Sequence, residues 1–521
     1  MEIDRMTRCG CTALIAALTV CLPVTAAMAQ EPQTQDKQAP EKLENWQDPS
    51  VVDRQTEPPR VISTPFPDAA SALRGDREAL PTRQSLDGPW RFLLSPDPGS
   101  RPMEFFDPEV DVESWDEVTV PSSWHHAGFG AQADDPENSE NNAVGSYRRE
   151  FTLPEAWQGR TIMLRFFGVD SAFYVWVNGK NVGFSQAGRL PREFNITRQV
   201  QEGTNVVAVA VYQRSGTSDV GCPDSPASAG IVGSVELAAL ADLHIRDFDV
   251  QTELDETYTD ARLQLGVRVK SFVRPRTPVR LEAELLDAEG EAVLGTLAGE
   301  TTVPGFTDVG IGITVSVPEP LKWSAETPNL YTLVMTLLRE TGEVVEVVSA
   351  RIGFRSTEMR EGQLLINGVA VQLQGVGHHL HGFLTGPQPT TESMTEEIER
   401  IKADGFNAVR LSRHPAPYEW YEIADRHGLY VIDEAGISLH GGAERVGALA
   451  SQPEWQPALI ARTRGMVERG KNHPSIVAWS LGDGEGEGAN LDATRKWVEL
   501  RDPSRPVLSD VEFDWASLPP E

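Results

Sequence analysis

The hydrophobic period of the chain changes near Leu364. After this residue, short apolar runs rich in β-branched side chains alternate with amphipathic segments of helical period. A chain that alternates strand and helix in this way forms parallel strands, and closure of the sheet gives a barrel. The runs predict strands at 371–376, 408–412, 429–434, 475–481 and 506–509, and helices near 393–404, 417–427, 453–470 and 489–500.

A closed barrel of this type needs about eight strands and about 250 residues. Only five strands are predicted between residue 364 and residue 521. We therefore expect an incomplete barrel, truncated at its C-terminal side.

The chain before the barrel has an all-β pattern. Short runs of alternating polar and apolar residues cover 85–240, including residues 172–177 followed by the turn Asn178-Gly179, and the pattern resumes over 241–355. Two successive β-sandwiches are the expected result. Residues 30–60 are rich in Gln, Pro and charge and are interpreted as a linker.

The N-terminus has the layout of a secretory signal peptide. Arg5 and Arg8 precede an apolar stretch over 12–24, and Ala27-Met28-Ala29 forms a small-residue cleavage site. The apolar stretch is too short for a comfortable membrane span. We expect an exported protein, periplasmic or secreted, with no membrane segment after cleavage at residue 29.

The net charge limits the partners of the chain. Asp and Glu number 77 against 46 Lys and Arg, which gives a formal charge of −31. Such an excess of negative charge argues against nucleic acid and anionic membranes as partners.

Residues 473–490, HPSIVAWSLGDGEGEGAN, predict a buried strand that ends in a loop of glycines and carboxylates. Ends of this kind carry the chemistry of α/β barrels. The stretch resembles the acid/base strand of glycoside hydrolase family 2, the β-galactosidase and β-glucuronidase family, whose pattern is W-S-L-G-N-E-S-G-x-G-x-N. The matching residues are Trp479, Ser480, Leu481, Gly482, Gly486, Gly488 and Asn490.

Further stretches support the same resemblance and imply the domain order. SLDGPWRF and GVDSAFYVWVNGKNVGFSQ are similar to the family's sugar-binding jelly-roll domain, expected at 61–240. WSAETPNLY is similar to its immunoglobulin-like domain, expected at 241–356, and a truncated TIM-barrel domain is expected at 357–521. The resemblance thus implies a multidomain β and α/β fold.

The acid/base strand differs from the family pattern at the two positions whose side chains take part in the family's chemistry. The family's Asn falls on Asp483 and its catalytic Glu falls on Gly484. Glu485, one residue later, is the candidate substitute for the acid/base, because the surrounding glycines leave the loop backbone free to bend. A solvated loop charge is the alternative, and the family's nucleophile is expected beyond residue 521.

The resemblance also implies substrate contacts at the ends of other strands. The candidates are Asp224, His379, Arg410, Arg413, Glu434, His440 and Asp483. For Arg410, Asp433 and Glu434, a buried network of charges at the barrel mouth is an equal alternative, since buried charges are usually paired.

The family's magnesium site is expected to be lost, so no cofactor is predicted. Its E-x-H motif reads Ser438-Leu439-His440 here, and its acid/base ligand aligns with Gly484. Mg²⁺ prefers charged oxygen ligands, and one histidine cannot hold it. A zinc site formed by His378, His379, His381 and His440 is the weaker alternative, because no thiolate or carboxylate completes it.

These residues predict a β-galactosidase-like protein whose ancestral reaction is retaining hydrolysis of terminal β-D-galactosides. Its activity is expected to be greatly reduced or absent, as in a pseudoenzyme, and whether it is an enzyme stays open. One alternative is a non-catalytic protein that binds a β-galactoside or related glycan. Another is one half of a split glycosidase with a complementing chain, or a homo-oligomer, because an open barrel exposes strand edges.

Overall fold

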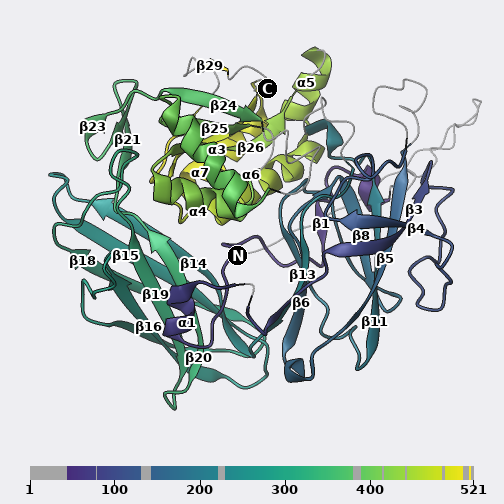
Figure 1. Ribbon diagram of the computed structural model, residues 1–521. Helices are drawn as coiled ribbons and strands as arrows, with labels where there is room; N and C mark the ends of the chain where they lie inside the picture. Colours follow the sequence, from purple (N-terminus) through teal and green to yellow (C-terminus); the bar gives the residue numbers. More distant parts are fainter. Residues whose placement is uncertain are drawn as a thin grey trace, which may run out of the picture. The chain divides into compact units, whose positions relative to one another are not determined.

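The computed structural model describes residues 44–77, 79–130, 142–220, 229–379, 389–412, 416–439, 443–483, 487–508 and 516–517. The first part of this range forms a β-sandwich (Figure 1). Its larger sheet has the order β1-β9-β8-β11-β5-β3-β4, its smaller sheet the order β10-β6-β13-β2, and β12 pairs with β7. The strands are β1 (Asp53–Arg54), β2 (Arg83–Ser85), β3 (Gly88–Ser95), β4 (Asp116–Val120), β5 (Val144–Thr152), β6 (Thr161–Phe166), β7 (Val169–Asp170), β8 (Ala172–Val177), β9 (Lys180–Ser185), β10 (Arg192–Asn195), β11 (Thr204–Tyr212), β12 (Gly230–Ile231) and β13 (Val235–Leu240).

The core of the sandwich comes from the alternation of its strands. Trp90 and Phe92 on β3 face Tyr147 on β5, and these aromatic side chains are almost fully buried. β1 lies in the segment that composition suggests is a linker, yet it pairs with β9 through Asp53 and Arg54.

A second sandwich follows. One sheet has the order β14-β15-β18 and the other β17-β16-β19-β20, with all pairs antiparallel. β15 alternates almost strictly between buried and exposed residues, as expected where one face of a sheet meets the core. The strands are β14 (Leu243–Leu254), β15 (Ala261–Ser271), β16 (Thr277–Leu286), β17 (Leu297–Val303), β18 (Asp308–Val317), β19 (Tyr331–Arg339) and β20 (Val344–Ile352), and the short helix α1 (Ala69–Arg74) contacts β19 and β20.

The third part is an open sheet of parallel strands, preceded by the small antiparallel sheet of β21 (Thr357–Arg360), β22 (Gln363–Ile366) and β23 (Val369–Ala370). The order in the parallel sheet is β28-β27-β26-β25-β24-β29. All nine residues of β26 are buried, as expected for a parallel strand covered on both faces. The strands are β24 (Gly375–His379), β25 (Ala408–Ser412), β26 (Tyr430–Ser438), β27 (Ile476–Asp483), β28 (Val507–Leu508) and β29 (Ala516–Ser517).

Helices cover one face of this parallel sheet (Figure 1). α3 begins at a capping box in which Thr390 and Ser393 satisfy each other's backbone N–H groups, and its buried residues Met394, Ile398 and Ile401 follow helical spacing. The helices are α3 (Thr391–Ala403), α4 (Tyr418–His427), α5 (Ala443–Ser451), α6 (Gln456–Gly470) and α7 (Ala489–Arg501). None of the helices in the described ranges is long and apolar enough to span a membrane.

The predicted architecture of two β-sandwiches and an incomplete α/β barrel is confirmed. Several elements differ in detail: β24 begins four residues later than the apolar run that starts at 371, and β26 continues to Ser438 rather than ending at Glu434. The sequence patterns did not predict α5 or β29.

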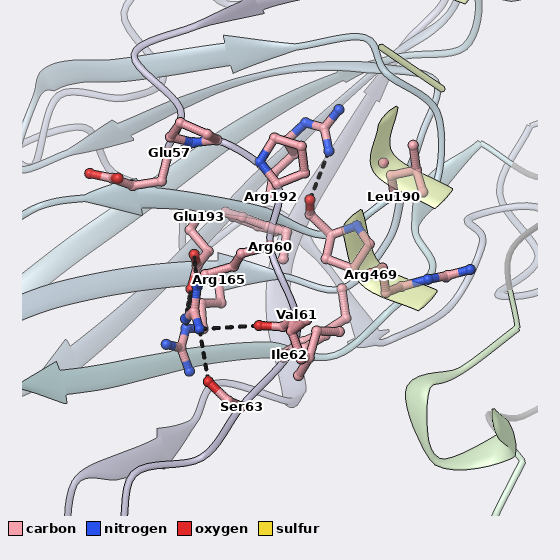
Figure 2. A pocket seen from close by; sticks show the side chains of 16 residues that line it. Glu57, Arg60, Val61, Ile62, Ser63, Arg165, Leu190, Arg192, Glu193 and Arg469 are labelled. Carbon is pink, nitrogen blue, oxygen red and sulfur yellow. Dashed lines mark hydrogen bonds and ion pairs between the residues drawn. The ribbon is translucent and has the colours of Figure 1, made fainter. Parts of the chain in front are cut away.

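Ion pairs join the N-terminal segment, both sandwiches and the barrel helices. Glu193 on β10 accepts hydrogen bonds from Arg60 at 2.7 and 2.9 Å and from Arg165 at 2.7 Å, and Arg246 lies 3.4 Å away. Figure 2 shows Arg60 and Arg165 beside Glu193. On the barrel side, Lys471 pairs with Asp247 at 2.7 Å. The charges therefore fix the open barrel against the sandwiches.

The buried carboxyl group of Glu346 leads us to expect that the stability of the folded chain depends on pH. It is buried on β20, accepts a hydrogen bond from the N–H of Ile245, and burial raises its pKa to about 7 from the ordinary 4.5. Between these two values the folded state holds a proton that the unfolded state releases, so stability falls as pH rises. This decline amounts to about 3 kcal/mol by pH 8.

Glu346→Gln removes the titrating group and keeps an acceptor for the Ile245 N–H. We expect the Tm of the variant to exceed that of the wild type by an amount that grows from pH 5 to pH 8. Thermal unfolding followed by circular dichroism across this range measures the difference. A difference that is constant with pH would contradict the assignment to Glu346.

Candidate active site at the strand ends

The parallel register brings the C-terminal ends of four strands to one edge. Arg410 on β25 lies level with Gly377 on β24 and with Ile432 on β26. Glu434, two residues beyond Ile432, lies level with Ser480 on β27. Active sites of α/β barrels form at this edge, because the loops that follow the strands meet there.

Arg410 and Glu434, two of the predicted substrate contacts, bind each other. The Nε and Nη2 atoms of Arg410 lie 2.9 and 2.7 Å from Oε2 of Glu434, and Nη2 also donates to the carbonyl oxygen of Gly482 at 3.1 Å. The Glu434 side chain is only 1% exposed. One guanidinium group thus links β25, β26 and β27 at this edge of the sheet.

Asp433 belongs to the helix layer instead. Tyr421 of α4 donates its hydroxyl to Oδ1 at 2.8 Å, and Nη2 of Arg469 on α6 lies 3.4 Å from Oδ2. The residue is fully buried, and burial raises the pKa of its carboxyl group despite these partners. Since neighbouring residues of a strand point to opposite faces, Asp433 supports the fold while Glu434 lies on the side of the sheet that Arg410 occupies.

The motif residues that match the family have packing roles. A Cβ on Gly482 would lie 1.6 Å from the carbonyl oxygen of Ile437, so only glycine fits beside β26. The indole N–H of Trp479 donates to Asp502 at 2.9 Å, and Asn490 donates to the carbonyl oxygens of Leu449 and Gln452 at 2.9 and 2.7 Å. The motif residues that this chain shares with the family therefore support the structure around the end of β27.

The other predicted site residues are placed in part or not at all. His379 pairs with Ser412 and Asp483 with Ser438 by backbone register, and their side chains lie outside the described part of the structure. Asp224, Arg413, His440, Gly484 and Glu485 lie outside the described residues altogether. The predictions for these residues stay predictions.

Sequence reasoning missed two contributors. One is the carbonyl oxygen of Gly482 as an acceptor for Arg410, which the glycine in the motif could have suggested. The other is Arg469, whose guanidinium group reaches Asp433, Tyr421 and the carbonyl oxygen of Ala416. Arg469 lies 36 residues from Asp433, and no local signal connects them.

The position of the family's carboxylate ligand carries Ser438, which is buried at the end of β26. A neutral hydroxyl is a poor replacement for a carboxylate at a magnesium site. Within the described ranges, no group of three or more His, Cys, Asp or Glu side chains is arranged to hold a metal ion. The two remaining positions, His440 and Gly484, lie outside those ranges.

Comparisons with known proteins agree with this architecture. Family models described as the sugar binding domain of glycosyl hydrolases family 2, as glycosyl hydrolases family 2, and as its TIM barrel domain match residues 83–241, 243–355 and 357–516. Proteins named beta-galactosidase from Priestia megaterium and Vibrio cholerae are 35% and 36% identical over 86% and 89% of this chain. The chain spans 45% and 46% of the length of these two relatives.

Solved structures show the same fold. A Bacteroides uniformis beta-glucuronidase superimposes with a TM-score of 0.70 at 22% identity, covering 82% of this chain and 52% of that one. A Bifidobacterium dentium beta-glucuronidase gives a TM-score of 0.68 at 25% identity over 83% and 76% of the two chains. The three family models and the identity over most of its length show that this chain belongs to glycosyl hydrolase family 2.

Proposed function

We propose that this chain is a β-galactosidase-like protein whose family reaction is the retaining hydrolysis of terminal β-D-galactosides, with greatly reduced or no turnover of its own. One observation supports a β-galactoside as the substrate of the family reaction. The relatives named beta-galactosidase are 35–36% identical over 86–89% of the chain, whereas the structural neighbours named beta-glucuronidase reach only 22–26%. The sugar would bind at the C-terminal ends of β24 to β27.

The reduced turnover follows from the chemistry that retaining hydrolysis requires. Two carboxyl groups about 5–5.5 Å apart must act as acid/base and nucleophile. The family's acid/base position holds Gly484. Of the two nearby carboxylates that the structure describes, Glu434 is bound by the guanidinium group of Arg410, and Asp433, on the helix side, is bound by that of Arg469. Neither is therefore placed to replace the missing acid.

Ligand-observed NMR tests the galactoside assignment without requiring turnover. A non-hydrolysable thio-β-galactoside would show saturation transfer from the chain, and the corresponding thio-β-glucuronide would show at least about tenfold weaker binding, a difference of about 1.4 kcal/mol. Arg410→Lys keeps a cation at the site and serves as the matched variant. Equal binding of both sugars, or binding of the glucuronide alone, would contradict the galactoside proposal.

We also propose that the chain is exported, on the basis of the N-terminal charges, the apolar stretch and Ala27-Met28-Ala29. Its partner would be a glycan, with a complementing chain or a second copy as the other candidates. Expression with the N-terminus intact, followed by N-terminal sequencing, would give Gln30 as the first residue. Recovery of the chain only with Met1 intact would contradict export.

A further inference from the structure

The outer face of the larger sheet of the first sandwich carries aromatic side chains. Alternation along β8 and β11 points Val175 and Val209 toward the core between the two sheets. Tyr174, Trp176 and Tyr212 therefore lie on the opposite face of the same strands. The outer face of an antiparallel sheet commonly meets water and carries polar residues, so aromatic residues there call for a separate explanation.

These three side chains belong to a row of five aromatic rings. Trp46 stacks on Tyr212 with ring centroids 5.1 Å apart, and Phe106 stacks on Trp176 with centroids 5.0 Å apart. Tyr174 lies between the two stacks, with its ring 5.9 Å from those of Tyr212 and Trp176. Tyr212 is buried, whereas the other four side chains are partly exposed. The row therefore presents aromatic surface to the solvent.

Hydrogen bonds hold the two segments that supply the ends of the row. Nε2 of Gln186 donates to the carbonyl oxygen of Asp48 at 2.7 Å, which fixes the segment that carries Trp46. Nη1 of Arg148, on the outer face of β5, donates to the carbonyl oxygen of Val110 at 2.8 Å and holds the loop between β3 and β4 against the sheet. Because both segments are fixed, the rings need little ordering when a ligand binds.

Exposed carboxylates lie at both ends of the row. Glu44 accepts a hydrogen bond from the indole N–H of Trp46 at 2.7 Å, and Glu104 and Asp107 are exposed on the loop between β3 and β4. Arg101 lies against the rings from the same loop, but its Nε and Nη1 atoms are buried. Carboxylates accept hydrogen bonds from hydroxyl groups and repel anions. The charge beside the rings therefore favours a neutral, hydroxyl-rich ligand.

We propose that this row of rings binds a neutral glycan on the outer face of the first sandwich. A pyranose ring has apolar C–H faces that pack on aromatic rings, and its hydroxyl groups lie at the rim, where the carboxylates of Glu44 and Asp107 accept hydrogen bonds. The site is separate from the strand-end edge and does not depend on the proposed β-galactoside specificity.

Native affinity electrophoresis of the full chain tests this site, with linear β-galactan, hydroxyethyl cellulose or carboxymethyl cellulose in the gel at matched ionic strength. The two cellulose derivatives share a backbone and differ in charge. We expect at least one of the two neutral polysaccharides to retard the chain saturably, and carboxymethyl cellulose to bind at least about tenfold more weakly than that one. No retardation by either neutral polysaccharide, or stronger retardation by carboxymethyl cellulose than by both of them, would overturn the proposal.

Variants at the two ends of the row isolate the role of the rings. Trp46→Ala should weaken binding of the neutral polysaccharide about tenfold, whereas Trp46→Phe keeps a ring and should stay within about threefold of the wild type. Phe106→Ala decides the outcome if Trp46→Ala does not fold. The matched control is Phe306→Ala, which removes a ring that is 60% exposed on the second sandwich and should leave the affinity unchanged.

Wild-type affinity in both Trp46→Ala and Phe106→Ala, or an equal loss in Phe306→Ala, would contradict the site. A thio-β-galactoside separates this face from the strand-end edge. Its addition at saturating concentration should leave the retardation unchanged, and loss of the retardation would assign the polysaccharide to the strand-end edge and contradict the proposal.

Discussion

Glu193→Ala should lower the free energy of unfolding by about 3–5 kcal/mol, because it leaves buried guanidinium groups without their carboxylate. Arg60, Arg165 and Arg246 meet on this one side chain and come from three separate parts of the chain. Urea unfolding followed by tryptophan fluorescence measures the loss as a lower transition midpoint.

The matched control is Glu253→Ala. Glu253 pairs with Arg262 on the surface, where their side chains are 60% and 56% exposed. Exposed pairs contribute little, so this variant should keep the wild-type midpoint. Equal shifts of the transition midpoint by the two substitutions would show that the ion pairs around Glu193 do not stabilise the fold.

The contribution of Glu193 also has a pH signature. Although burial opposes ionisation, Arg60, Arg165 and Arg246 together hold the pKa of this carboxyl group well below its ordinary 4.5. The unfolded state therefore takes up a proton first as pH falls below about 4.5, and the stabilisation is progressively lost there. The raised pKa of Glu346 makes stability fall as pH rises, which is the opposite direction. Stability is therefore highest between the pH range in which Glu193 takes up a proton and the range in which Glu346 loses one.

Trp479→Ala should lower the free energy of unfolding by about 3–5 kcal/mol. The indole ring is fully buried in the barrel core, its N–H donates to Asp502, and the guanidinium group of Arg505 lies 5.4 Å from its ring centre. Removal of the ring creates a cavity and leaves Asp502 without one of its donors.

Trp497 on α7 supplies the comparison. It packs against the same core but is only partly buried, so Trp497→Ala should cost less than half as much. Urea unfolding and limited proteolysis of the barrel follow both variants. A loss of galactoside binding in Trp479→Ala without a loss of stability would contradict its assignment to the scaffold.

The strands of the barrel could be predicted from the sequence, and the contacts between them could not. The apolar runs located β25 and β27 to within two residues. β26 runs further than predicted because it continues through a register shift between Glu434 and Ile437, where Gly436 takes a positive φ of 65°. An apolar run that ends in carboxylates gives no sign that pairing goes on beyond them.

The roles of Asp433 and Glu434 show the same limit at the site. Alternation requires that they face opposite sides, yet both sides of a barrel strand are buried, so the pattern cannot say which one meets the helices. The pairing of Arg410 with Glu434 depends on the register of strands that are separated by a whole helix. The family motif gave the position of the site, and only the structure shows which of its charges bind each other.

The most direct test of the account is hydrolysis of nitrophenyl β-D-galactoside by the folded chain, compared with Glu485→Gln. Such a substrate needs little acid assistance, so it reveals any remaining nucleophile. We predict turnover below about 0.01 s⁻¹, at least about a thousandfold under the typical enzyme value, and no further fall in Glu485→Gln. Turnover near 10 s⁻¹, or a rate that collapses in Glu485→Gln, would show that a catalytic carboxylate has been re-sited and would contradict the account.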